Sequence, residues 1–123
     1  MECQNNFWPW FSREEYARRY GRIRAAMRAR NLDCLIVYGI GGYLGTDPAQ
    51  PNVVYIASFA GFVQTYVVFP LDGEPTLFTT WGNHLKNVKQ TTHLKDVRIG
   101  GMGQTPLRVA DRLKELGLER KRI

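Results

Sequence analysis

A glycine-rich segment, Gly39 to Gly45, follows an apolar run and is the part of the chain that most suggests ligand chemistry. Glycines directly after a strand let the backbone approach a pyrophosphate, provided that a helix begins next with its amino terminus facing the phosphates. Here the third glycine is displaced by one position, and Thr46 to Pro51 contains prolines where that long helix would have to begin. No acidic residue follows a second strand to bind a ribose. We therefore interpret the segment as a flexible connection.

The histidine, aspartate and serine side chains form no recognisable catalytic or metal-binding pattern. His84 and His93 are the only histidines, and neither has a second ligand at the spacing that a helical metal site requires. The aspartates are scattered, and most fall at predicted turns or helix caps. Ser12 is placed to cap a helix, and Ser58 lacks the glycine-x-serine-x-glycine context of an esterase nucleophile. We therefore predict no catalytic residue, no metal ligand and a surface position for both histidines.

Composition indicates one folded domain. The chain has 123 residues, of which 44% are hydrophobic and 23% charged, and these are ordinary globular values. Cys34 lies in an apolar run and is interpreted as a small buried side chain, so the two cysteines give no disulfide framework. Residues 1–6 lack the features of a signal peptide, and no apolar run approaches the roughly 20 residues that span a bilayer. We predict a cytoplasmic protein without membrane contact.

Near its amino terminus the chain is predicted to form a long amphipathic helix over residues 13–30. Ser12 and Glu15 have the spacing of a capping box, and Phe11 and Tyr16 have that of a hydrophobic staple. The apolar side chains expected to face the core are Tyr16, Tyr20, Ile23 and Met27.

Strands are expected after Asn31, which suits the position just past a helix end. The apolar and partly β-branched run Cys34–Tyr38 is predicted to be a strand that is buried on both faces. A loop then extends to Asn52. The further predicted strands are Val53–Ile56, Gln64–Phe69, Thr76–Thr80 and Asp96–Ile99, with a proline-glycine turn over residues 70–75.

Two more helices complete the expected order. One is a weak helix over residues 83–90, and the other opens with Thr105 and Pro106 in the favoured first positions and stops before Gly117. Residues 120–123 are interpreted as the approach to another strand. Hairpins mixed with crossovers predict an α/β fold, with a mixed β-sheet flanked by helices.

The formal charge of +6 raises the question of nucleic-acid binding. Seven arginines lie on the first predicted helix: Arg13, Arg18, Arg19, Arg22, Arg24, Arg28 and Arg30. At about 100° per residue they scatter around most of the circumference outside the apolar sector. A helix that reads a groove would concentrate them on one side, so we interpret them as a solvated surface and predict no nucleic-acid partner.

The order of several segments resembles the amino-terminal domain of the creatinase, prolidase and Xaa-Pro aminopeptidase family. The resemblance rests on Phe11–Tyr16, on Leu32–Val37, on Asn52–Phe59 with its asparagine-x-x-tyrosine pattern, and on the Val67–Leu77 hairpin. It continues through Leu116–Leu118 and Lys121–Ile123, so that it covers the chain collinearly from Phe11. It implies a ribonuclease H-like creatinase/prolidase amino-terminal domain over residues 11–123, preceded by a lead-in of residues 1–10.

The resemblance also implies a function. In the family, a following pita-bread domain binds two divalent metal ions, and none of its ligand positions exists in this chain, so no metal or catalytic residue is carried over. The amino-terminal domain is non-catalytic, supports a homodimer, and can extend a loop toward the active site of a neighbouring subunit. The corresponding residues here are Phe59, Gly61 and Phe62, for which hydrophobic packing is the plainer interpretation.

Two alternatives stay open beside this expectation of a non-catalytic domain from a metal-dependent hydrolase. The chain would instead be a free-standing binding or scaffold domain with no enzymatic partner, or a nucleic-acid binder that uses its arginine-rich helix. The long connection between Gly39 and Asn52 departs from the commoner family pattern, and it leaves the substrate of the parent enzyme open.

Overall fold

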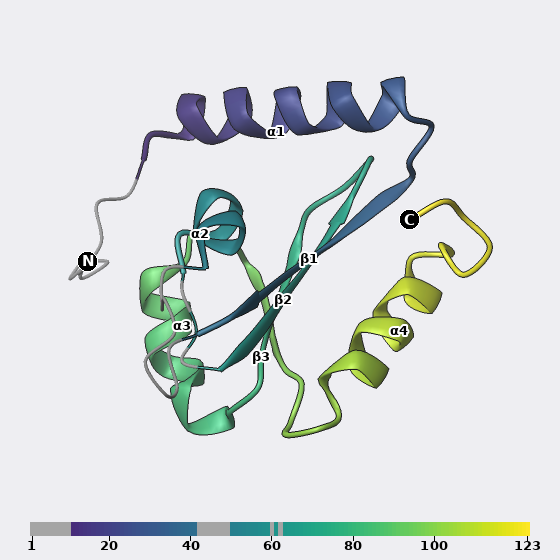
Figure 1. The fold of residues 1–123 in the computed structure, drawn as a ribbon. Coiled ribbons are helices and arrows are strands. Elements are labelled where there is room, and N and C mark those ends of the chain that lie inside the picture. Colours follow the sequence, from purple (N-terminus) through teal and green to yellow (C-terminus); the bar gives the residue numbers. More distant parts are fainter. Residues whose placement is uncertain (1–10, 42–49, 60, 62) are drawn as a thin grey trace.

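The computed structural model describes residues 11–41, 50–59, 61 and 63–123. Helices and strands are mixed along these residues (Figure 1). Their order is α1 (Arg13–Ala29), β1 (Cys34–Ile40), α2 (Pro51–Ala57), β2 (Gln64–Pro70), β3 (Thr76–Thr79), a 3₁₀ turn (Gly82–His84), α3 (Leu85–Thr91), β4 (Asp96–Ile99) and α4 (Thr105–Glu115).

The four described strands form one mixed sheet in the order β1-β2-β3-β4. β2 pairs antiparallel with β1, with Val37 opposite Val67, and also with β3, whereas β4 follows a helical crossover and pairs parallel to β3. Helices α1, α2 and α3 cover one face, and α4 lies on the other (Figure 1). The predicted α/β class with a mixed sheet and flanking helices is confirmed.

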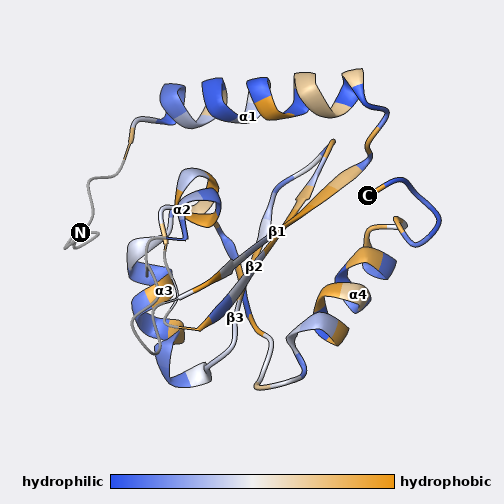
Figure 2. Ribbon diagram, viewed as in Figure 1, coloured by the Kyte–Doolittle hydropathy of each residue, from blue (hydrophilic) through white to orange (hydrophobic). Residues whose placement is uncertain are grey.

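Each face of the sheet has its own apolar core. The larger core lies under α1, α2 and α3 and contains Met27, Val53, Ile56, Ala57, Val67, Phe69, Leu77, Val88 and Leu94. The smaller core lies under α4 and contains Cys34, Val68, Phe78 and Val109. In Figure 2 the orange of the strands meets orange stripes on the helices, while much of α1 is blue. Adjacent residues on a strand therefore serve different cores, as the alternation of side chains requires.

The Ser12 cap, the contact between Phe11 and Tyr16 and the turn at Asn31 are as the sequence predicts, whereas the Glu15 carboxylate, expected to reach back to Ser12, accepts from Arg18 and Arg19. The Ser12 hydroxyl accepts a hydrogen bond from the backbone N–H of Glu15 at 3.2 Å, and Phe11 packs edge-on against Tyr16. Asn31 has φ of 54° and follows the last turn, and its N–H donates to the Arg28 carbonyl. Asparagine tolerates this left-handed conformation, so the chain turns sharply from α1 into β1.

The strand predicted at Val53–Ile56 is wrong, because these residues belong to helix α2. Pro51 occupies the first turn of the helix, where its missing N–H removes no hydrogen bond. Val53, Ile56 and Ala57 are buried at helical spacing against the sheet. A β-branched run of four residues cannot by itself distinguish a buried strand from a buried helix turn, and packing decides here.

The expectation that the first strand is buried on both faces is also wrong. β1 lies at an edge of the sheet, and Ile36, Tyr38 and Ile40 are exposed. The residues between them, Leu35 and Val37, pack against the larger core. Since α4 makes its main sheet contacts with β2 and β3, it leaves this part of the opposite face open.

The carboxyl-terminal segment differs in detail from the prediction. Gln104 precedes α4, and Thr105 is its first residue, fully buried, with its hydroxyl bonded to the Gly101 carbonyl. Gly117 ends the helix with φ of 67°, as predicted. Residues 120–123 form no strand, but the Arg122 carbonyl accepts a 2.8 Å hydrogen bond from the N–H of Asp33, beside the start of β1.

Candidate functional site

The loop after α2 holds the residues predicted for a substrate rim or subunit contact. Gly61 is buried, and Phe59 is half-buried against the larger core. The two lie close together, since a Cβ built on Gly61 would be 3.4 Å from the Phe59 ring. Phe62 falls outside the described residues. Phe59 and Gly61 therefore both lie toward the interior of the domain.

Gln50 fixes this loop from the opposite side. Its side chain is buried, and its Nε2 donates to the carbonyls of Gly61 at 2.9 Å and Val63 at 2.8 Å. Its Oε1 accepts from the N–H of Gly61 at 3.3 Å. One amide thus satisfies three backbone groups that the loop would otherwise bury without partners.

The fit around Gln50 requires small neighbours. A Cβ on Gly39 would lie 2.9 Å from the Gln50 Oε1, and a Cβ on Gly61 would overlap the Thr65 hydroxyl. Gln50 itself has φ of 38°, a left-handed conformation that is unfavourable for most residues. This clamp could not be predicted from the sequence, because Gln50 lies in what was predicted to be a loop.

A second polar cluster joins α1 to the end of α2 and to the segment before β4. Tyr16 stacks on His93 with ring centroids 3.6 Å apart, and its hydroxyl is hydrogen-bonded to the Ser58 hydroxyl. The Tyr20 hydroxyl donates to the Ile56 carbonyl at 2.7 Å and lies 2.9 Å from Nε2 of His93. The predicted surface position of His93 is therefore wrong, because two tyrosines from α1 cover the ring.

The environment sets the charge of these groups. Burial, and after it the positive charge of Arg19, lowers the pKa of His93 to about 4, so the ring is neutral at pH 7. Burial raises the pKa of Tyr20 well above its usual value. Because the single Tyr20 proton is donated to Ile56, we assign the ring proton of His93 to Nε2, which donates to the Tyr20 oxygen.

These contacts do not assemble a nucleophile. The Ser58 hydroxyl is bonded to Tyr16, whereas the imidazole of His93 is bonded to Tyr20. Acyl transfer by serine needs the hydroxyl hydrogen-bonded to its base, and that base oriented by a third group. The cluster instead holds α1 against α2. No sequence spacing could reveal it, since its members come from distant segments.

The arginines of α1 are mostly exposed, as predicted, but Arg19 is an exception. It is 8% exposed, with its guanidinium 4.0 Å from the centre of the Phe11 ring and 4.5 Å from that of Tyr55. It also donates to Glu15 at 2.7 Å and to the Tyr55 carbonyl. Hydrogen bonds from Arg18 and Arg19 lower the pKa of Glu15 to about 2. Arg19 therefore fastens α1 to α2.

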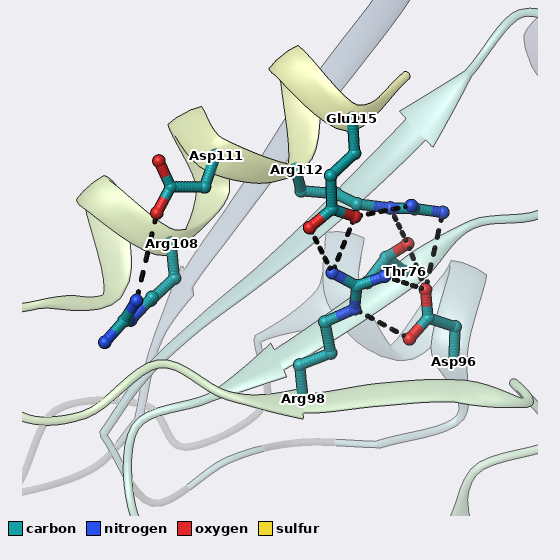
Figure 3. A network of polar contacts seen from close by, with 7 residues as sticks. All are labelled: Thr76, Asp96, Arg98, Arg108, Asp111, Arg112 and Glu115. Carbon is teal, nitrogen blue, oxygen red and sulfur yellow. Dashed lines mark hydrogen bonds and ion pairs between the residues drawn. The ribbon is translucent and has the colours of Figure 1, made fainter.

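A charged network fastens α4 to the other side of the sheet (Figure 3). Arg98 on β4 bonds Asp96 at 2.9 Å and Glu115 at 2.9 Å, and Arg112 on α4 bonds Glu115 at 2.8 Å. Arg112 also donates to the Thr76 hydroxyl at 3.0 Å. Although partial burial raises the pKa of Asp96, the bonds from Arg98 and Thr76 outweigh it and lower that pKa overall. The carboxylates of Asp96 and Glu115 are thus both paired with arginines.

Other chemistry-bearing groups are scattered. Within residues 11–41, 50–59, 61 and 63–123, no three His, Cys, Asp or Glu side chains lie together as metal ligands would. Burial raises the pKa of the Cys34 thiol to about 11, so it stays protonated at pH 7, in line with the predicted buried role. Among the helices described, none has the length and apolar character needed to cross a bilayer.

Comparison with solved structures shows that the fold of this chain occurs in known proteins. The chain is similar to a crystal structure of the aminopeptidase P, an Xaa-Pro aminopeptidase, from Streptococcus thermophilus, with a TM-score of 0.58. The match covers 83% of this chain and 67% of that chain at 22% sequence identity. The two chains share a fold. No protein-family model matches this chain, and no curated protein matches it.

Proposed function

We propose that this chain is the non-catalytic amino-terminal domain of a metal-dependent hydrolase that resembles Xaa-Pro aminopeptidases. The observation that carries the proposal is the shared fold with the Streptococcus thermophilus aminopeptidase P over 83% of this chain. The collinear segments from Phe11 to Ile123 support the same family independently of the fold. The parent enzyme would act on an imidodipeptide, a proline-containing peptide or a small amidine, and would bind its two divalent metal ions outside this domain.

The polar groups of the domain support a structural role. Ser58 and His93 are engaged by tyrosines of α1, and Asp96 and Glu115 are engaged by Arg98. Each of these interactions joins two elements of the fold. We propose that the domain contributes a stable platform and a dimer contact to the parent enzyme, and that it has no turnover of its own.

Purified chain tests the absence of turnover directly. Residues 1–123, incubated with manganese or zinc and an Xaa-Pro dipeptide, should release no proline, and the dialysed protein should hold far less than one metal ion per chain. Stoichiometric metal or hydrolysis by this chain would contradict the proposal. A positive control with an authentic Xaa-Pro peptidase establishes that the assay conditions support hydrolysis.

We further propose that the loop at Phe59 and Gly61 forms part of a substrate rim in the parent enzyme. Phe59→Leu preserves an apolar side chain of similar volume, so the unfolding midpoint of the domain should change little. In the parent enzyme the same variant should raise KM for a proline peptide. An unchanged KM would leave Phe59 with packing alone and would contradict the rim role.

A further inference from the structure

The turn between β2 and β3 contains an aspartate that is followed directly by a glycine, Asp72 and Gly73. Both residues are exposed, and Gly73 has φ of 109°, a conformation that residues with a side chain rarely adopt. Apart from its chain neighbours, only Pro70 among the described residues would lie within 4 Å of a Cβ built on Gly73, at 3.8 Å. A carboxyl group and an unhindered backbone nitrogen are therefore adjacent on the surface.

Neither of these two groups is held by a hydrogen bond. Within the described part of the chain, the Asp72 carboxylate has no hydrogen-bond or ion-pair partner, and the N–H of Gly73 has no acceptor. Gly73 is held at its carbonyl instead, which accepts a hydrogen bond from the Arg24 guanidinium on α1. The Asp72 side chain is thus free to turn toward the Gly73 nitrogen.

The other aspartates lack this combination. Each of the other described aspartates precedes a residue that carries a side chain, which crowds the nitrogen of that residue, and each is paired with a basic side chain or a backbone N–H. These are Asp33, Asp96 and Asp111. Asp47 precedes Pro48, which has no backbone N–H. No asparagine in the sequence precedes a glycine either.

We propose that Asp72 is a site of spontaneous isomerisation to isoaspartate, through a succinimide formed with Gly73. The Gly73 nitrogen attacks Cγ of the Asp72 carboxylic acid, a C–N bond forms, and the proton of the nitrogen leaves with the acid hydroxyl as water. Water then opens the ring, and its addition at Cγ restores aspartate, whereas its addition at the backbone carbonyl of Asp72 gives isoaspartate. One water leaves and one returns, so the reaction needs no oxidant or cofactor. Because the reacting groups are neighbours in one chain, no encounter step slows it.

The product changes both the turn and its chemistry. The main chain at position 72 then runs through Cβ and is longer by one methylene, which displaces the Gly73 carbonyl that Arg24 binds. The α-carboxylate becomes a free side group. A free α-carboxylate of this kind is the substrate of protein carboxyl methyltransferases, which transfer the methyl group of S-adenosylmethionine to a carboxylate oxygen. The turn is therefore also a conditional methylation site.

Ageing of the full chain tests the proposal. After several weeks at neutral pH and body temperature, isoaspartate is measured by enzymatic transfer of labelled methyl groups and located by peptide mapping, in which isomerisation changes the retention of a peptide but not its mass. We expect the product at position 72 and its complete loss in Asp72→Glu, whose longer side chain would have to close a less favourable ring. Asp111→Glu is the matched control, because the Asp111 side chain is 55% exposed but lies inside α4, and it should leave the signal unchanged. Circular dichroism confirms that both variants are folded.

A synthetic peptide of residues 68–76 gives the rate of isomerisation without the fold. Because the turn leaves both reacting groups free, the folded chain should isomerise within about tenfold of the rate of the peptide. A chain that stays free of isoaspartate at position 72 while the peptide converts would overturn the proposal. Equal methyl incorporation in Asp72→Glu and in the wild-type chain would overturn it as well. Neither result bears on the proposed peptidase family, which does not depend on this turn.

Discussion

At the scale of single residues, Gln50 is the most consequential side chain of the loop region. Gln50→Ala removes all three hydrogen bonds to Gly61 and Val63 and leaves buried backbone groups unsatisfied. Such groups cost about 1–3 kcal/mol, so we expect the free energy of unfolding to fall by about 2–3 kcal/mol. Urea denaturation of the two proteins measures this difference. A loss below about 0.5 kcal/mol would show that the clamp contributes little.

Gly61 offers an independent test of the same loop. Gly61→Ala forces its new methyl group onto the Thr65 hydroxyl, and overpacking of this kind costs about 1–3 kcal/mol. Gly21→Ala is the matched control, because Gly21 lies in exposed α1 with no atom within 4 Å of the added Cβ. We expect the control to stabilise the protein by about 0.5–1 kcal/mol, since alanine favours helix. Thermal unfolding midpoints should therefore move in opposite directions.

His93 gives the stability of the protein a defined pH dependence. The pKa of His93 falls from 6.5 to about 4 on folding, so between these values the unfolded chain binds the additional proton. The contribution of His93 to the free energy of unfolding should be fully present above pH 6.5 and should decline as the pH falls toward 4. Allowing for solvent around a partly buried ring, we expect a loss of about 2 kcal/mol over this window.

Urea denaturation at pH 7 and at pH 4.5 measures this loss. His93→Gln cannot titrate and should lose less stability than the wild-type chain over the same interval. Glu15, Asp96 and Glu115 have lowered pKa values, so their contributions are lost at lower pH and overlap little with this window. Equal losses in the two proteins would contradict the assignment to His93.

At the scale of elements, the attachment of α4 depends on Arg112. Arg112→Ala removes bonds to Thr76 and Glu115 from a side chain that is only 18% exposed, and we expect a loss of about 1–3 kcal/mol. Arg108→Ala on the same helix removes a 3.9 Å ion pair from a side chain that is 61% exposed and should cost less than about 0.5 kcal/mol. Equal effects in chemical denaturation would show that the network in Figure 3 contributes nothing specific.

Local sequence signals predicted the elements that local chemistry determines. Ser12 caps the start of α1, and Asn31 and Gly117 follow the last turns of α1 and α4, as expected. The turn at residues 70–75 joins β2 to β3. Val53–Ile56 was assigned wrongly because a short apolar run fits either a strand or a helix, and only packing against the sheet selects between them. The open face of β1 was missed because it depends on where α4 lies.

The candidate sites were less predictable than the fold. The hydroxyl and imidazole contacts of Tyr16, Tyr20, Ser58 and His93 join residues up to 77 positions apart, as the pairing of Tyr16 with His93 shows. No spacing rule connects such distant residues. Phe59 and Gly61, which we propose for a substrate rim, could be located from the family resemblance, but their burial could be seen only in three dimensions.

At the scale of the whole molecule, the distribution of arginines predicts weak interaction with nucleic acid. Arg19 is buried against aromatic rings, and Arg18 is paired with Glu15, which removes both from a continuous basic stripe. Electrophoretic mobility assays with duplex DNA and single-stranded RNA at low salt should show no shift at micromolar protein. Tight binding that weakens steeply with salt would instead support a nucleic-acid function.

We propose that this domain is part of a metal-dependent hydrolase similar to Xaa-Pro aminopeptidases. The most direct measurement is to sequence the gene beyond the codon for Ile123. The account predicts that the reading frame continues for roughly another domain or more, with spaced aspartates, a histidine and glutamates suited to two metal ions. A stop codon within a few positions would contradict the account, and the domain would then act alone as a binding or scaffold protein.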